Sequence, residues 1–92
     1  MSDLKKLLRL KGVSLRAVAR QYGIGYHSLQ KTFKGRRKSR KYQAVIAEYF
    51  GTRVEALFGP ASSDVIRYLM EKEIDRHGEH RKEALRKEFL GE

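Results

Sequence analysis

The chain has 92 residues, a net charge of +10, no cysteine and 40% hydrophobic residues. This length allows one domain with a small core, and the absence of cysteine excludes disulfides and thiolate metal sites. No apolar run approaches the ~20 residues of a membrane span, and MSDLKKLLRL is too charged for a signal peptide, so we expect a cytoplasmic protein.

The basic charge is concentrated in the first part of the chain. Residues 1–60 hold 14 Lys and Arg against Asp3, Glu48 and Glu55, whereas residues 61–92 hold seven basic and eight acidic residues. Such asymmetry indicates a polyanionic partner, and nucleic acid is the commonest one. The alternatives are a generally basic solvated surface and an anionic membrane surface.

Apolar residues at i, i+3 and i+4 between glycines predict five helices in residues 1–60. They are expected at residues 3–11, 15–22, 26–34, 41–50 and 54–58. Ser2 and Ser14 are the expected N-caps of the first two helices, while Gly12, Gly23, Gly35 and Gly51 are the expected stops.

Gly59 and Pro60 predict a break, because glycine readily adopts left-handed geometry and proline cannot continue a helix. The break coincides with the change in charge, so we expect one domain at residues 1–60 and a helical extension at residues 61–92. Ser62, Ser63 or Asp64 is the expected cap of a sixth helix. Gly78 is expected to weaken that helix, and Leu85 and Phe89 to continue a thinner apolar stripe to the end. The predicted fold class is all-α.

Residues 16–33, RAVARQYGIGYHSLQKTF, have the pattern of two helices that cross steeply at a tight turn. Such a crossing requires a small residue, supplied by Ala19, and a turn residue with positive φ, supplied by Gly23. The apolar residues that would anchor both helices are Val18, Tyr22, Ile24, Leu29 and Phe33. The pattern predicts a helix-turn-helix whose second helix, at residues 26–33, enters the major groove of DNA.

Two segments of the sequence carry a family resemblance: KGVSLRAVARQYGIGYHSLQKTF and, after it, VIAEYFGTRVEALFGP. With them, residues 4–60 resemble the lambda-repressor-like class, and most closely the Ner family of small phage and bacterial regulators. The resemblance implies a five-helix DNA-binding domain at the nucleoid of a bacterial or phage-infected cell. Gly25 replaces the usual Ser or Thr cap, a basic run replaces the usual Pro-Lys, and residues from Ala61 onward lie outside the resemblance.

The resemblance implies base contacts from the first turns of the recognition helix: Tyr26, His27, Gln30 and Lys31. Their chemistry suits base edges, since lysine donates to guanine and glutamine pairs with adenine. An ordinary solvated helix face is the alternative, and Tyr26 could instead pack on a phosphate.

Phosphate contacts are expected from the basic run that follows this helix and from the preceding helix. The predicted residues are Arg16, Arg20, Lys34, Arg36, Arg37, Lys38, Arg40 and Lys41. A localisation patch or a plain solvated loop is the alternative for the run.

The extension has an apolar stripe of Val65, Ile66, Leu69, Met70 and Ile74. It could cover the core of its own chain or pair with a second chain. Because one helix-turn-helix reads only about half an operator, we predict a homodimer through this stripe.

No pattern of catalytic residues is present, and His27, His77 and His80 lack the spacing of a four-ligand metal site. We therefore expect no enzyme, cofactor, membrane partner or small-molecule substrate. The prediction is a sequence-specific regulator, a repressor, that binds double-stranded DNA. The alternatives are a sequence-blind architectural or RNA-directed binder and a DNA-anchoring component of a transposition or antitoxin assembly.

Overall fold

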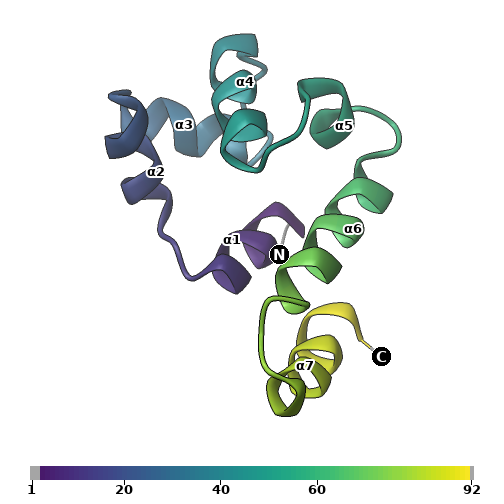
Figure 1. Cartoon of the computed structure of the whole chain (residues 1–92). Helices are drawn as coiled ribbons and strands as arrows, with labels where there is room; N and C mark the ends of the chain where they lie inside the picture. Colours follow the sequence, from purple (N-terminus) through teal and green to yellow (C-terminus); the bar gives the residue numbers. More distant parts are fainter. Residues whose placement is uncertain (1–2, 92) are drawn as a thin grey trace.

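The structure, a computed structural model, describes residues 3–91 and contains no strand in that range. Its helices are α1 (Asp3–Lys11), α2 (Leu15–Tyr22), α3 (Tyr26–Phe33), α4 (Arg40–Tyr49), α5 (Val54–Phe58), α6 (Ser62–Ile74) and α7 (Glu79–Leu85), followed by a π-helical turn, η1 (Arg86–Leu90). The all-α prediction of a helix-turn-helix domain with extra C-terminal helices is confirmed (Figure 1).

The first five helices lie where the apolar spacing places them. The bounds of α1, α2 and α5 agree with the prediction, and those of α3 and α4 differ by one residue. Ser14 caps α2 as expected, because the Ala17 amide donates to its Oγ at 3.1 Å. The other predicted cap, Ser2, lies outside the described residues.

One hydrophobic core joins both parts of the chain. Helix α1 contributes Leu4, Leu7, Leu8 and Leu10 to it, and Leu29 and Ile46 are almost completely buried on α3 and α4. Figure 1 shows α1 between the α2–α4 group and α6. Because α1 packs against both, the side chains of the C-terminal segments join the same core as those of residues 1–60.

The prediction for the last third of the chain is wrong in two details. Helix α6 ends at Ile74, and Gly78 is the N-cap of the separate helix α7 rather than a weak point within α6. Ala61 stands at the N-cap of α6 and makes no side-chain cap bond, so none of the three predicted residues caps this helix.

Gly59 is required for a reason other than the expected left-handed geometry. Its φ of −93° and ψ of −174° are those of extended backbone. A Cβ at this position would collide with the backbone carbonyl of Glu55, so the close approach of the chain to α5 excludes a side chain.

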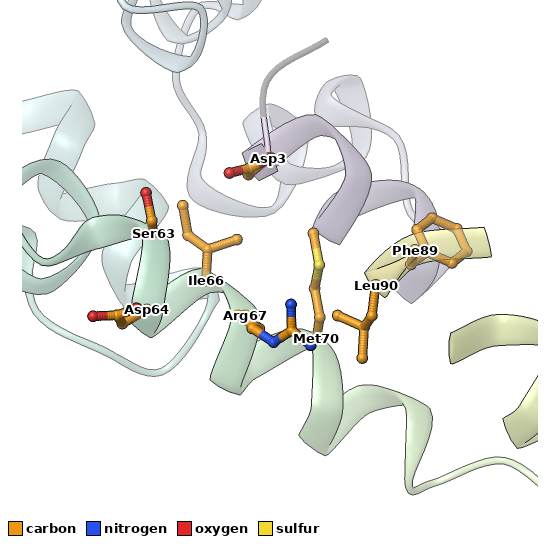
Figure 2. A pocket seen from close by; sticks show the side chains of 8 residues that line it. All are labelled: Asp3, Ser63, Asp64, Ile66, Arg67, Met70, Phe89 and Leu90. Carbon is orange, nitrogen blue, oxygen red and sulfur yellow. The ribbon is translucent and has the colours of Figure 1, made fainter. Parts of the chain in front are cut away.

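The apolar stripe of α6 divides into a buried and a half-exposed part. Ile66, Met70 and Ile74 are buried in the core of the chain itself, whereas Val65 and Leu69 are half-exposed. Figure 2 shows Met70 beside Leu90 of η1, and Leu90 packs against the core cluster to which Met70 belongs. A dimer contact through the three buried side chains would require α6 to leave α1.

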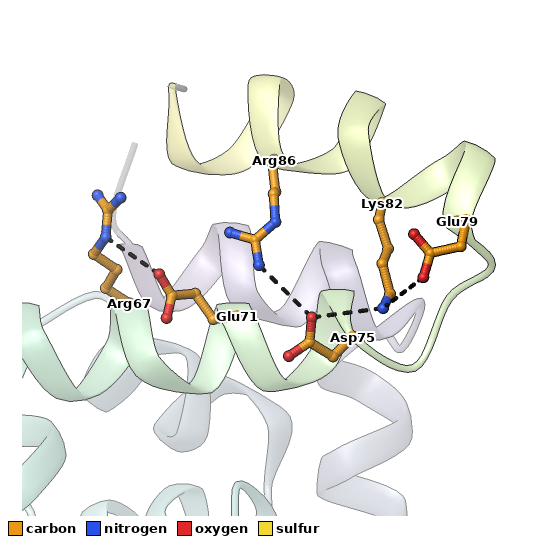
Figure 3. Close-up of polar contacts among 6 residues, drawn as sticks. All are labelled: Arg67, Glu71, Asp75, Glu79, Lys82 and Arg86. Carbon is orange, nitrogen blue, oxygen red and sulfur yellow. Dashed lines mark hydrogen bonds and ion pairs between the residues drawn. The ribbon is translucent and has the colours of Figure 1, made fainter.

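Ion pairs fasten α7 and η1 to the end of α6. Lys82 Nζ lies 4.0 Å and Arg86 Nη2 lies 3.7 Å from Asp75 Oδ1, and Lys82 also pairs with Glu79 at 3.4 Å (Figure 3). Exposed pairs of this kind contribute only about 0–1 kcal/mol each. Burial of Leu85 is therefore expected to contribute more than these pairs to holding the segment in place.

Candidate nucleic-acid interface

The turn between α2 and α3 fixes the angle at which α3 leaves the core. Gly23 has φ 64° and ψ 38°, and the Ile24 amide donates to the Ala19 carbonyl at 3.0 Å. This is the hydrogen-bond pattern of a glycine-terminated helix. Ala19 is 3% exposed, so the small residue lies inside the packed crossing, as the pattern requires.

Two of the four predicted base-contacting side chains project into solvent. His27 and Lys31 are exposed and lie four residues apart, hence on one face of α3. Lys31 provides a cationic donor, and His27 provides a ring that donates or accepts. This face therefore presents the chemistry that recognises base edges in a major groove.

The other two predicted base-contacting residues, Tyr26 and Gln30, are half-buried, and their side chains form a hydrogen bond with each other. Gln30 Nε2 donates to the Tyr26 hydroxyl at 3.0 Å. The Arg16 guanidinium lies 4.1 Å from the centre of the Tyr26 ring, and the His27 ring meets the ring of Tyr26 edge-on at 5.5 Å. Tyr26 thus links α2 to α3 and orients the side chain of Arg16, a contact that the sequence pattern did not indicate.

A left-handed glycine, Gly35, closes the end of α3 just before the basic run. Gly35 has φ 77°, and the Arg36 amide donates to the Lys31 carbonyl at 2.9 Å. Arg36, Arg37 and Lys38 follow directly and are exposed. The run therefore lies immediately beside the end of the recognition helix.

Besides Arg16, two more arginines of the predicted phosphate set have partners within the chain. Arg37 Nη1 donates to Ser28 Oγ at 3.5 Å, so Ser28, which sequence reasoning missed, supports the loop. Arg40 Nη2 lies 2.9 Å from Glu55 Oε1 in an exposed ion pair. A hydrogen bond from its own backbone amide and the bond from Arg40 lower the pKa of Glu55. The remaining predicted residues, Arg16, Arg20, Lys34 and Lys41, are also exposed.

The surface around α2 and α3 contains no carboxylate from its own segment. Residues 4–47 include no Asp or Glu, and the nearest acidic residues in sequence are Asp3 and Glu48. Gly25, the N-cap of α3, offers no side-chain acceptor, so the first backbone amides of α3 add positive potential. This combination favours a polyanion.

Residues 3–91 offer no cluster of three or more His, Cys, Asp or Glu that could hold a metal ion. Within the same range, no helix has both the length and the apolar character needed to cross a membrane.

A helix with one exposed polar face, set at a fixed angle by a tight turn and followed by a basic loop, is the arrangement of a helix-turn-helix nucleic-acid-binding domain. A sequence model of winged helix-turn-helix DNA-binding domains matches residues 1–73, and the chain belongs to this family. Its partner is double-stranded DNA. A wing is a β-hairpin, whereas residues 3–91 contain no strand and a loop at residues 34–39 follows α3. No curated protein and no solved structure matches the chain.

Proposed function

We propose that the chain is a sequence-specific transcriptional regulator, a repressor, that inserts α3 into the major groove of its operator. The exposed pair His27 and Lys31 on α3, within a segment (residues 4–47) that contains no Asp or Glu, carries this proposal. These side chains would read base edges while the residues around them bind phosphates. A repressor of this kind acts by occupying a promoter.

The remaining contacts are proposed to fix the position of α3 on the duplex. Arg16, held over Tyr26, and the exposed run Arg36, Arg37 and Lys38 would bind phosphates on either side of the groove. Tyr26 and Gln30 are proposed to contact the duplex only at their exposed edges, because their side chains are hydrogen-bonded to each other.

We infer, beyond the match to the winged helix-turn-helix family, that the chain is similar to the Ner-like regulators of the lambda-repressor-like class. The segments KGVSLRAVARQYGIGYHSLQKTF and VIAEYFGTRVEALFGP support this inference. We also propose that a homodimer binds a two-fold symmetric operator, because one recognition helix reads only about half a site. Val65 and Leu69, the half-exposed part of the stripe, are the proposed centre of the dimer contact.

The proposal is tested by selection of binding sites from random duplex DNA at a stated salt concentration, followed by titration of the selected and a scrambled site. Lys31→Ala is expected to lose ~1–3 kcal/mol of preference for the selected site. Lys38→Ala, the matched loss of one charge in the loop, is expected to weaken both sites about equally and to reduce the salt slope by about one.

Equal losses on both sites from both variants would contradict sequence-specific reading and favour an architectural binder. Selection of a site without two-fold symmetry would contradict the proposed dimer.

A further inference from the structure

A hollow of about 310 Å³ opens between α1 and α3, and we name it the α1–α3 hollow. Its volume falls at the lower end of the ~300–1,000 Å³ found for small-molecule sites. Its floor consists of the apolar side chains Leu8, Val13, Leu15 and Phe33. A floor of this kind favours the apolar body of a ligand over an inorganic ion.

The floor continues into the core. A narrow crevice beneath it shares Leu8, Leu15 and Phe33 with the hollow and extends toward Ile46 and Tyr49. The crevice is too narrow for water in the present packing.

The rim of the hollow is cationic. Lys5, Arg9 and Lys34 line it, and no carboxylate is among its lining residues. Arg9 also pairs with Glu88, which does not line the hollow, at 3.8 Å. An apolar floor under a cationic rim is complementary to a molecule with an apolar body and one anionic end.

Polar groups that could orient such an anion also lie on the hollow. Ser14 provides a hydroxyl, and Tyr26 and Gln30, joined by a hydrogen bond, close the side toward α3. We propose that the α1–α3 hollow binds a small amphiphilic carboxylate, with its chain on the apolar floor and its carboxylate between Lys5 and Lys34.

Occupation of the hollow is expected to weaken DNA binding. The carboxylate would neutralise the charge of Lys34, a proposed phosphate contact. The ligand would also contact Tyr26 and displace the ring that orients Arg16. The chain would then release DNA when the carboxylate is abundant. This regulatory part depends on the proposed function, whereas the binding of the carboxylate does not.

The test is a titration of the full 92-residue chain with octanoate, without DNA, followed by ¹H–¹⁵N NMR. We expect saturable shifts centred on the amides of Val13, Leu15, Gln30 and Lys34. Octanol has the same number of carbon atoms as octanoate but no charge. It is expected to bind about fivefold more weakly, because it cannot form the partly exposed ion pair with the lysines. Acetate and octylamine are expected to produce no saturable shifts.

Three substitutions assign the site. Lys34→Gln is expected to weaken octanoate binding about two- to fivefold, whereas Lys6→Gln, which removes a charge from α1 outside the hollow, should leave it unchanged. Val13→Asp places a carboxylate at the hollow and should weaken octanoate binding at least as much as Lys34→Gln does. Val13→Thr, which adds a polar group without a charge, is the control for this variant. Lys34 is exposed, so its variant remains informative if Val13→Asp unfolds.

Shifts spread along residues 34–41 without saturation, or equal affinity for octanoate and octanol, would overturn the proposed site. An octanoate complex that keeps full affinity for operator DNA would overturn its regulatory part. An octanoate complex of a chain that binds no DNA would contradict the proposed function but leave the carboxylate site assigned.

Discussion

Ile74→Ala tests whether the α6 stripe belongs to the core of its own chain. Ile74 is 0% exposed at the end of α6 and joins the cluster that contains the α1 leucines. Truncation of a fully buried isoleucine costs about 2–5 kcal/mol, through lost burial and the cavity that remains. A domain of this size has a total stability of about 5–14 kcal/mol, so the loss is a large fraction of it.

The measurement is urea unfolding followed by far-UV circular dichroism at two protein concentrations that differ widely. If the stripe packs within one chain, Ile74→Ala lowers the midpoint by the same amount at both concentrations. The melting temperature should fall by roughly 8–40 °C, since 1 kcal/mol corresponds to ~4–8 °C for a chain of this length.

Tyr68→Ala is the matched control on the same helix. Tyr68 is 57% exposed, and surface substitutions usually change stability by less than about 0.5 kcal/mol. A loss below about 1 kcal/mol for Ile74→Ala would refute the packing of α6 described here, because a fully buried isoleucine cannot be truncated so cheaply. A wild-type midpoint that rises with protein concentration, a rise abolished by Ile74→Ala, would instead place Ile74 in a dimer contact.

Three further outcomes follow from local geometry. Gly25→Ser should raise stability by a few tenths of a kcal/mol, because Gly25 has φ −70° and open space at its Cβ, and serine would cap α3; lower stability in urea unfolding would contradict this. Tyr26→Leu should weaken DNA binding by about two- to fivefold, because it removes the stacking that orients Arg16. A double-mutant cycle with Arg16→Gln should then show that the two losses of affinity are coupled, and strictly additive losses would exclude a role of this stacking in DNA binding. Burial is the main cause that raises the pKa of Tyr22 and Tyr49, so the folded state retains these phenol protons more strongly than the unfolded state. The contribution of the two tyrosines to stability should therefore be constant below pH ~10 and be lost above it, and a urea midpoint that rises above pH ~10 would contradict this sign.

The sequence predicted the fold most accurately where local signals agree. At Gly23 and Gly35, apolar spacing and the glycine stop agree, and α2 ends one residue before Gly23 and α3 two residues before Gly35. The helix-turn-helix was therefore readable from local periodicity and turn chemistry.

The end of α6 was not readable in the same way. Nothing before Gly78 breaks the helical pattern, yet α6 stops at Ile74 so that the chain can return and place Leu85 on the core. Such a reversal is favoured by burial between segments distant in sequence, which local propensity does not report. The pairing of Tyr26 with Gln30 and its stacking with Arg16 likewise depend on rotamers and on the crossing of α2 and α3.

The separation of charge along the sequence becomes a separation in space. Figure 1 shows α7 and η1 at the opposite end of the molecule from α2–α4, and the longest dimension of the molecule is 38 Å. Interactions between exposed charges decay over a Debye length of ~8 Å at physiological salt, so the carboxylates of α7 should barely reduce the proposed attraction between α3 and DNA. Two other carboxylates lie closer to this surface: Glu55 of α5 pairs with Arg40, and Glu48 of α4 is near enough to contribute to the raised pKa of Tyr22 on α2. Residues 61–92 can therefore form their own ion pairs, such as those at Asp75, without weakening the basic surface of α2–α4 that is proposed to bind DNA.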